Sequence, residues 1–516
     1  MPTSTASIAS EQNERTSLLS RHSDPDLRSD AEQGTVPIVP GYEPPINPMN
    51  QKSARVYHVV LVLLFALALF WLSLLSVDQL ISVGVGATQG SGFECFSTTL
   101  LGVAAIGLSL LFYRAPSPSD RTLSLLSAGI LFVDMLIISM VDQLRRRIGP
   151  VPMLCSFGGA AIACLLSSVS DTVVDHATSE EQERLLGHTS KRRSLLEWLG
   201  VILSNVARVT VFVLIAILSM NLIFDAADSH LTVGTLVPVG GLPDSSNDAS
   251  TFIHLACSPA GTHGPVVLIE AGETSGEDMH NWVQRAEGIK AVCYWDRPGL
   301  GLSDNSPSPI GVDATVTYLL SALETEIPSF REERLLLVSH GVGALYSRVF
   351  ANKVAEQVAG LMLVDALHEE QFYASQTALH GLREFVRGVM APLSTTKLQG
   401  VLKGLGAEER LFGLLTRAQP RLHKALLQQQ VSANQRSRLD ISLATSALPR
   451  DTPVLVVSSA EMCNDKQWNR YQRLLLKLTD RVVAWKILEG PHNLWWNKAA
   501  EKDLTAQLEA FVAYVK

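Results

Sequence analysis

Side chains capable of nucleophilic chemistry stand at the ends of apolar runs in the C-terminal half of the 516-residue chain. Ser339 lies within LLLVSHGVGALYSR (335–348), Asp365 closes the run LMLVD, and His492 follows a Gly-Pro pair. A hydroxyl, a carboxylate and an imidazole can form an activated nucleophile if they lie within hydrogen-bond reach of one another. Whether they do depends on the elements that carry them.

Short apolar, β-branched runs alternate with amphipathic helical segments from His230 onward. The predicted strands cover 252–257, 266–269, 291–295, 335–338, 361–364, 454–457 and 482–487. The predicted helices include 314–326, 344–357 and 499–515. Strands that are apolar throughout are typical of a parallel sheet buried on both faces. Residues 230–516 therefore predict an α/β domain, mostly parallel, with a doubly covered sheet.

Five stretches of this domain resemble, in order, the motifs of the α/β-hydrolase superfamily. They are LIEAG (268–272), YWDRPGLGLSD (294–304), VSHGVGA (338–344), LVD (363–365) and GPH (490–492). In that family they correspond to the strand before the oxyanion loop, the D-R-x-G-x-G-x-S-D turn, the nucleophile elbow, the next strand and the histidine loop. The resemblance covers about residues 250–516 and implies an α/β-hydrolase fold.

The nucleophile elbow departs from the family motif G-x-S-x-G. Alignment through His340 and Gly343 puts Gly341 at the nucleophile position, and Ser339 takes the place of the first glycine. Glycine carries no side-chain oxygen, so it cannot form an acyl-enzyme. A frame shifted by two residues would make Ser339 a displaced nucleophile. That frame puts Leu337 where the motif has glycine and leaves a strand of only about four residues.

The resemblance also assigns the other catalytic roles. His492 takes the place of the general base, and Asp365 is the first choice for its orienting acid. Glu461 and Asp465, after the following strand, are the alternative acids. A histidine and an acid without a nucleophile can still activate water, although we expect low activity without covalent catalysis.

The backbone of Gly272, Glu273 and Val342 is implied as the oxyanion hole. The family usually continues with a second glycine after Gly272, whereas this chain has Glu273. A carboxylate beside a developing oxyanion opposes its negative charge unless it is turned away or protonated. A Glu273 side chain that simply faces solvent is the alternative.

The insertion at 369–450 contains helical patterns over 379–389, 397–405 and 411–427. In the family, an insertion at this point forms a cap over the pocket. Near a membrane, an apolar cavity shaped by such a cap suits an acyl chain or another apolar ligand. A helical lid packed only for stability is the alternative.

The N-terminal part has the composition of a membrane protein. The whole chain is 47% hydrophobic and 18% charged, with a mean hydropathy of +0.19. Apolar runs that can each cross a lipid bilayer as a helix cover 56–83, 95–112, 123–141, 151–169 and 196–224. The second and fourth are rich in Gly, Ala and Ser, which is typical of helices in close contact. Residues 56–224 therefore predict an all-α transmembrane bundle of about five spans.

Basic residues favour a cytosolic N-terminus and a lumenal C-terminal domain. Lys52 and Arg55 precede the first span, and residues 191–193 precede the fifth. The arginines at 145–147 then fall on the opposite side. The alternative is that spans three and four form a re-entrant pair, or that only one of them crosses, which would reverse the remainder.

Two ionisable residues lie deep within the spans, Asp134 in the third and Arg208 in the fifth. Charges at such depth usually meet a partner inside the bundle, so the sequence predicts that these two form an ion pair. A structural pair is the plainer interpretation, and a transport or relay role is the alternative.

Residues 1–55 contain Pro, Ser, Asn and mixed charge and predict a disordered tail. Within it, ERTSLL, with Glu14, Leu18 and Leu19, resembles the acidic dileucine signals read by adaptor complexes on the way to endosomes and vacuoles or lysosomes. This motif predicts an endomembrane location, vacuolar or endosomal, with an adaptor complex as a partner. An incidental charged stretch is the alternative.

Charge and cysteine content exclude several classes of function. A net charge of −8 gives no basic surface for nucleic acid. The six cysteines form no CxxC pair and no regular spacing, so they indicate neither a zinc site nor a disulfide framework. We expect no metal and no cofactor.

These observations predict a polytopic endomembrane protein whose hydrolase-like domain is a pseudoenzyme that binds or scaffolds. A membrane-bound hydrolase of a lipid or carboxylic ester, using Ser339 with His492, is the first alternative. A transport-related role of the bundle is the second.

Overall fold

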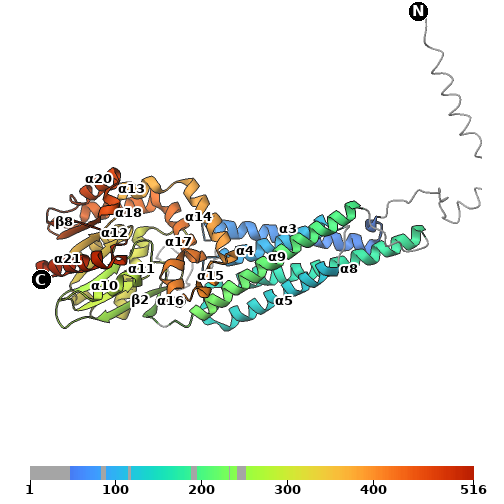
Figure 1. Cartoon of the computed structure of the whole chain (residues 1–516), viewed down its shortest axis with the longest axis horizontal. Helices are drawn as coiled ribbons and strands as arrows, with labels where there is room; N and C mark the ends of the chain where they lie inside the picture. The colour runs from blue at the N-terminus through green and yellow to red at the C-terminus, as the bar shows by residue number, and fades with distance from the viewer. Residues whose placement is uncertain (1–46, 83–88, 114–117, 187–194, 232, 241–250) are drawn as a thin grey trace, which may run out of the picture.

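The computed structural model describes residues 47–82, 89–113, 118–186, 195–231, 233–240 and 251–516. A bundle of long helices forms one end of the molecule, and a sheet covered by helices forms the other (Figure 1). A group of shorter helices lies where the two meet. Residues 1–46, which include the tail motif with Glu14, Leu18 and Leu19, lie outside the described residues.

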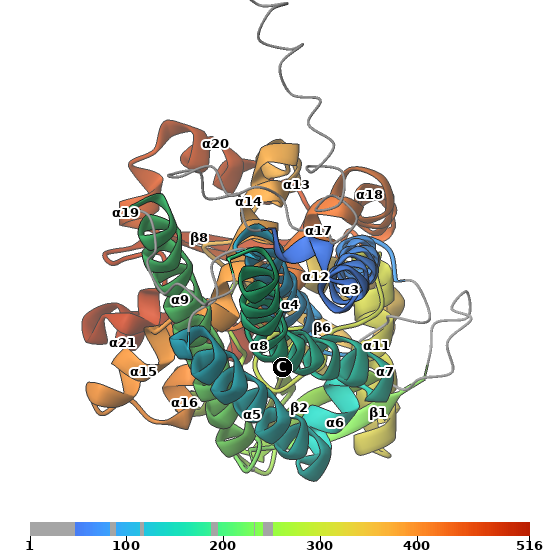
Figure 2. The same cartoon turned by 90° about the vertical axis from the view of Figure 1, so that its right-hand side faces the viewer.

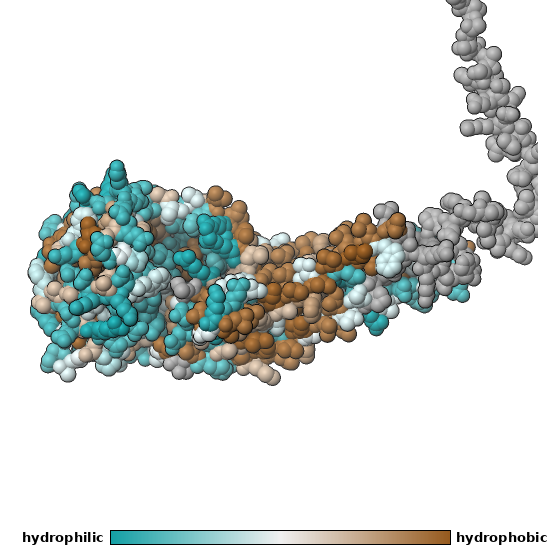
Figure 3. All heavy atoms as spheres, in the orientation of Figure 1, coloured by the Kyte–Doolittle hydropathy of each residue, from teal (hydrophilic) through white to brown (hydrophobic). Residues whose placement is uncertain are grey.

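Among the described residues, the bundle contains five helices that are long and apolar enough to cross a membrane. They are α3 (Lys52–Asp78), α4 (Phe93–Leu111), α5 (Pro118–Met140), α8 (Gly159–Leu186) and α9 (Leu195–Asp228). Three short elements join α5 to α8, namely α6 (Asp142–Ile148), α7 (Pro150–Pro152) and the π-helical η2 (Met153–Gly158). Apolar side chains cover much of the bundle surface seen in Figure 3. The predicted all-α membrane bundle is confirmed.

Small residues bring α4 and α8 into close contact. A Cβ atom at Gly102 of α4 would lie 3.0 Å from the Cα atom of Ala160 on α8. The Ser167 hydroxyl of α8 donates to the Ala105 carbonyl of α4 at 3.2 Å. The Gly, Ala and Ser content of these two spans is what such close packing requires.

In the described part of the C-terminal domain, eight strands form one sheet with the order β1-β2-β4-β3-β5-β6-β7-β8. The strands are β1 (Thr235–Val239), β2 (Thr251–Pro259), β3 (Val266–Glu270), β4 (Ala291–Trp295), β5 (Leu335–His340), β6 (Val358–Val364), β7 (Val454–Ser459) and β8 (Val482–Leu488). Neighbours from β4 to β8 pair in parallel, whereas β2 pairs antiparallel with β1 and β4. The predicted α/β-hydrolase-like sheet is confirmed. Strand β1 was not predicted.

Helices cover both faces of the sheet and complete two hydrophobic clusters. On one face lie α11 (Val312–Glu326) and α12 (Gly343–Lys353). On the other lie α10 (Glu277–Gln284) and α21 (Lys498–Val515). The two clusters share no residue, because alternate side chains of each buried strand point to opposite faces.

The cap is an insertion between β6 and β7. Its helices are α13 (Glu369–Ser375), α14 (Ala378–Met390), α15 (Thr396–Leu402), α16 (Ala407–Leu411), α17 (Pro420–Ser432) and α18 (Arg438–Ala447). Several of them lie between the bundle and the sheet (Figure 1), and the view along the bundle shows the membrane helices in front of the sheet domain (Figure 2).

Ion pairs fasten the cap to the bundle. Arg410 of α16 donates from Nη2 to Asp228 at the end of α9 at 2.5 Å. Lys397 of α15 contacts Asp225, which is also on α9, at 2.5 Å. Lys424 of α17 lies 3.9 Å from Asp78 at the end of α3. Three cap helices are therefore each tied to a membrane helix by charge.

A disulfide joins Cys257 of β2 to Cys293 of β4. No pattern of cysteine spacing in the sequence indicated this single disulfide. The two residues lie 36 positions apart in sequence, so their spacing carries no signal. They come together because the antiparallel register of β2 and β4 sets them directly opposite each other.

Candidate functional site

The elbow between β5 and α12 has Gly341 at its apex. Gly341 has a φ of +50°, which a residue with a side chain adopts only under strain. Two residues later, a Cβ atom at Gly343 would lie 2.3 Å from the Glu270 carbonyl oxygen and 2.4 Å from that of Ala271. Only glycine fits at 343, as at the second glycine of the G-x-S-x-G motif. This geometry matches the frame in which Gly341 takes the nucleophile position.

Ser339 lies within strand β5 rather than at the turn. Its backbone is paired with Glu270 of β3 on one side and Leu363 of β6 on the other. The side chain is fully buried, and its hydroxyl has no hydrogen-bond partner among the described residues. The structure does not bring Ser339 to His492, so the shifted frame with a displaced serine is not the one adopted.

His492 and Asp365 form a close pair. His492 Nδ1 lies 2.7 Å from Asp365 Oδ2. The other carboxylate oxygen of Asp365 accepts hydrogen bonds from the Ser459 backbone N–H at 3.2 Å and from Trp468 Nε1 at 3.0 Å. Asp365 is completely buried and has a φ of +41°. With both oxygens engaged, the carboxylate holds one orientation of the imidazole.

The two alternative acids do not take part in this pair. Glu461 lies exposed in the first turn of the short helix α19 (Ala460–Cys463). Asp465 caps α20 (Lys466–Leu475) by accepting from the Gln467 backbone N–H at 2.8 Å. His492 Nδ1 contacts Asp365 instead.

Glu273 turns its carboxylate toward the elbow. Its Oε2 lies 4.0 Å from His492 Nε2, and its side chain is 55% exposed. A Cβ atom built on Gly341 would lie 3.7 Å from both oxygens of this carboxylate and 3.5 Å from the Cα of Gly272. The Glu273 side chain is therefore partly exposed to solvent and also borders the site. Its negative charge lies next to the apex of the elbow and to the backbone of Gly272. Val342, whose backbone is the other expected oxyanion donor, immediately precedes α12.

The electrostatics of the site favour a protonated His492. Burial lowers the pKa of His492, but the hydrogen bond and charge of Asp365 and then the charge of Glu273 raise that pKa above its ordinary value. The resulting stabilisation of the fold is fully present below the unfolded pKa of about 6.5 and is lost as the pH rises through the raised value. Burial holds the pKa of neighbouring His340 well below its ordinary value. Because a general base needs the neutral imidazole, the raised pKa shifts the range in which His492 can act as a base to higher pH.

An internal ion pair supports the loop that carries Glu273. Arg297 donates to the Gly272 carbonyl and lies 3.8 Å from Glu270 at the end of β3. Trp295 Nε1 donates to Glu270 at 2.6 Å. Burial raises the pKa of Glu270 to about 7, against the opposing effects of Arg297 and Trp295. Arg297 and Glu270 both lie within motifs shared with the α/β-hydrolase superfamily, but the resemblance assigned a role to neither residue.

The predicted ion pair between Asp134 and Arg208 is wrong. Arg208 contacts Asp120 at 3.3 Å and Asp171 at 3.4 Å. Asp134 instead accepts a hydrogen bond from the Ser219 hydroxyl at 2.5 Å. Helices α5 and α9 belong to spans three and five, which run in the same direction, so residues about 85 apart face each other. This register sets Arg208 beside the start of α5 and Asp134 several turns away.

No group of three His, Cys, Asp or Glu side chains suited to a metal ion occurs in the part of the chain that the structure describes. The site consists of an imidazole, two carboxylates and an apex without a side chain. Such a set can bind a proton or a polar group, and it offers no hydroxyl at the elbow for acyl transfer.

Comparison with known sequences identifies relatives in fungi. Residues 14–257 match the sequence model of a family described as "Region of unknown function (DUF2417)". An uncharacterized protein of Schizosaccharomyces pombe is 27% identical over 464 residues, which cover 82% of this chain and 84% of that protein. An uncharacterized vacuolar membrane protein of Saccharomyces cerevisiae is 22% identical over 365 residues, covering 59% of this chain and 56% of that protein.

Solved structures similar to the sheet domain include two hydrolytic enzymes. A thermophilic esterase from Thermogutta terrifontis gives a TM-score of 0.39 with 14% identity, covering 55% of this chain and 99% of the esterase. A haloalkane dehalogenase from Agrobacterium tumefaciens gives 0.38 with 13% identity, covering 55% of this chain and 98% of the dehalogenase. Similarity at this level says nothing about the chemistry of this chain. The chain is a membrane protein with an α/β-hydrolase-like fold.

Proposed function

We propose that this is a polytopic protein of the vacuolar membrane whose hydrolase-like domain binds or scaffolds without acyl-enzyme catalysis. The observation that carries the proposal is the apex of the elbow, where Gly341 leaves no side chain and Glu273 presents a carboxylate to His492. The vacuolar location is supported by the Saccharomyces cerevisiae relative, which is described as a vacuolar membrane protein, and by the tail motif with Leu18 and Leu19.

Electrostatics support the same proposal. Acyl transfer builds negative charge on the substrate oxygen. Enzymes that catalyse it stabilise this charge with backbone N–H groups. The carboxylate of Glu273 lies beside this position and opposes that charge. Its charge also helps to raise the pKa of His492, so the neutral imidazole that accepts a proton forms at higher pH than it would without Glu273.

Labelling with a serine-directed probe tests the proposal. The purified full-length chain should show no more reaction with a fluorophosphonate than a heat-denatured sample, and Ser339→Ala should not change the signal. A known serine hydrolase mixed into the same sample serves as the positive control. Stoichiometric labelling of the native chain that disappears in Ser339→Ala would establish the hydrolase alternative instead.

The sheet domain is proposed to lie on the lumenal side of the membrane, with the N-terminus in the cytosol. The arginines at 145–147 would lie in the lumen in this orientation, which the positive-inside rule disfavours. Each of them contacts another side chain. Arg147 contacts Asp304 of the sheet domain at 2.7 Å, Arg146 lies 3.9 Å from the centre of the Phe252 ring, and Arg145 contacts Asp142. The contacts of Arg146 and Arg147 put these arginines on the same side of the membrane as the sheet domain, which is the lumenal side in the proposed orientation. The disulfide between β2 and β4 agrees with an oxidising compartment.

A single substitution tests this orientation. Ala260→Asn creates the glycosylation sequon Asn-Gly-Thr in the exposed loop between β2 and β3. If this loop enters the lumen, the full-length variant should acquire a glycan whose mobility shift is removed by an endoglycosidase. Ala260→Gln is the matched control. A well-expressed Ala260→Asn chain that stays unglycosylated, while its sheet domain is digested by protease added to sealed vesicles from outside, would show the opposite orientation.

A further inference from the structure

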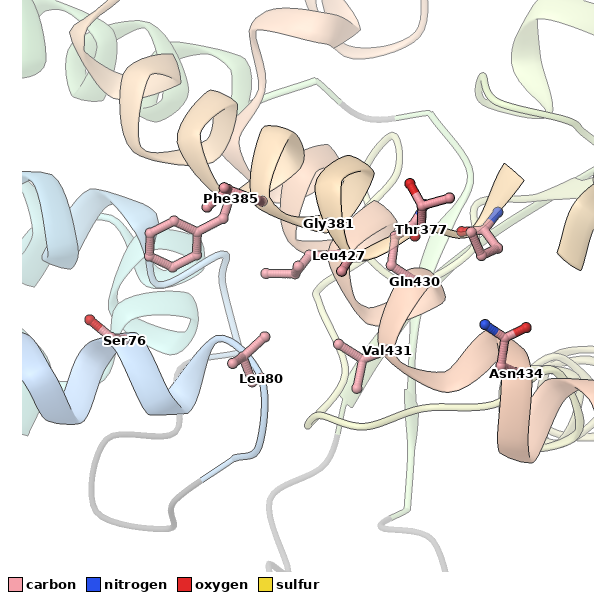
Figure 4. A pocket seen from close by; sticks show the side chains of 12 residues that line it. Ser76, Leu80, Thr377, Gly381, Phe385, Leu427, Gln430, Val431 and Asn434 are labelled. Carbon is pink, nitrogen blue, oxygen red and sulfur yellow. The ribbon is translucent and has the colours of Figure 1, made fainter. Parts of the chain in front are cut away.

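A cavity of about 510 Å³ opens where the cap meets the bundle (Figure 4). Ser76 and Leu80, at the end of α3, line one side of it. Phe385 of α14 and Leu427 of α17 line the others. None of the residues that line this cavity belongs to the site around His492, so the cavity shaped by the cap is a separate feature.

The lining changes in character from one end of the cavity to the other. Near the bundle it is lined by Leu80, Phe385 and Leu427, and the one hydroxyl there, on Ser76, donates to the Leu72 carbonyl of its own helix. Away from the bundle it carries the side-chain amides of Gln430 and Asn434 (Figure 4). No Asp, Glu, Lys or Arg side chain is among the lining residues. The walls therefore suit an apolar chain that ends in an uncharged or zwitterionic polar group.

The cavity adjoins a surface that faces lipid. The outward face of α14 carries Leu379, Leu382, Val386 and Met390, which are 52–76% exposed and follow one another at helical spacing. Val77, at the end of α3, is also exposed. Apolar surface is visible at the level of α14 beside that of the bundle (Figures 1 and 3). An amphipathic helix at the end of a membrane span is placed to enter the interfacial layer of the bilayer.

Aromatic contacts hold α14 in this position. The Phe385 ring packs edge-on against Phe93 and Phe96 of α4, with centroids 5.7 Å and 5.5 Å apart. The Ser97 hydroxyl of α4 donates to the Val389 carbonyl at 2.8 Å. The wall formed by α14 is thus fixed to a membrane helix and does not depend on a loop.

We infer that this cavity, which we call the α3–α14–α17 groove, binds one zwitterionic phospholipid from the adjoining leaflet. An acyl chain enters between Leu80, Phe385 and Leu427, and the amides of Gln430 and Asn434 donate hydrogen bonds to the glycerol esters or the headgroup phosphate. The continuity of the groove with the exposed faces of α3 and α14 identifies the occupant as a lipid. The inference does not depend on whether the sheet domain is catalytic.

Photo-crosslinking in nanodiscs tests the groove. The full-length chain is placed in phosphatidylcholine nanodiscs that contain a phosphatidylcholine with a diazirine on one acyl chain, and crosslinked peptides are mapped by mass spectrometry. Crosslinks are expected on α14 and α17 as well as on α3. Gly381→Phe should reduce the α14 and α17 crosslinks at least about tenfold relative to α3, because the ring takes the volume of several methylene groups. Gly381 has room for this change, since its Cβ would lie 3.8 Å from Leu427 Cδ1.

Gly406→Phe is the matched control, since Gly406 is exposed with nothing within 4 Å of its Cβ position, and its crosslinks should equal those of the native chain. Val431→Trp blocks the groove from α17 and is used if Gly381→Phe is not produced in folded form. Equal crosslinking in the native and blocked chains would overturn the proposal. So would labelling of α14 and α17 no stronger than that of peptides from β8, or a preference for a phosphatidylserine probe over phosphatidylcholine.

Discussion

Replacing Gly341 by serine and Glu273 by glycine together is expected to give a chain that reacts with fluorophosphonates and hydrolyses a short-chain ester. The elbow has room for the serine, because a Cβ atom at Gly341 meets its nearest neighbour, the Cα of Gly272, at 3.5 Å. The φ of +50° adds strain of about 1–3 kcal/mol, which nucleophile elbows tolerate. His492, oriented by Asp365, then has a hydroxyl to deprotonate. We expect a rate at least about a hundredfold above that of the native chain.

The single variants separate the two contributions. Gly341→Ser alone should react much more weakly than the double variant, because the carboxylate of Glu273 competes for the new hydroxyl and opposes the oxyanion. Glu273→Gly alone should not react, and Gly341→Ala with Glu273→Gly is the matched control for the hydroxyl. A folded double variant without labelling would mean that His492 and the backbone donors are not arranged for catalysis. Equal rates for Gly341→Ser and the double variant would remove the role given to Glu273.

Replacing Asp228 by alanine is expected to destabilise the full-length protein strongly. Asp228 and Arg410 are both buried, and Arg410 donates from Nε and Nη2 to this one carboxylate. Removing the aspartate leaves a guanidinium in the junction without its partner. Breaking a buried pair in this way costs about 3–5 kcal/mol. A fall in the apparent Tm of the detergent-solubilised protein, or loss of folded material on expression, measures it.

Asp142→Ala provides the control for this junction. Asp142 also pairs with an arginine at 2.5 Å, but both side chains are more than half exposed. Its loss should cost no more than about 1 kcal/mol. Replacing Asp228 and Arg410 together by a leucine and a methionine should recover much of the stability lost in Asp228→Ala, because no unpaired charge remains. Equal melting of Asp228→Ala and Asp142→Ala would contradict a buried ionic junction.

Much of the sheet follows from local sequence. Residues 291–295 were predicted as a strand and form β4 with the same bounds, because an apolar run between polar turns has few alternatives. Strand β1 was missed because it is short, contains Pro238 and stands at the sheet edge. Edge strands tolerate proline and need no continuous apolar run. Residues 235–239 form a strand because they pair with β2, and this pairing cannot be read from the residues of β1 alone.

Only part of the site could be predicted from the sequence. The resemblance pointed to His492 and Asp365, which the structure places 2.7 Å apart. The direction of the Glu273 side chain depends on the loop held by Arg297, so residue type alone left it open. The partner of Arg208 depends on the register between α5 and α9, which hydropathy does not reveal. The disulfide likewise follows from register, because Cys257 and Cys293 meet only across two paired strands.

The anchoring of the cap has a mechanical consequence. Lys397, Arg410 and Lys424 end on carboxylates of α9 and α3, so the cap cannot swing open on a hinge while those helices stay still. A thicker or thinner bilayer changes the tilt of membrane helices. Because the cap is tied to α3 and α9, such a change in tilt would move the cap relative to the sheet. The thickness of the surrounding membrane is thereby coupled to the position of the cap.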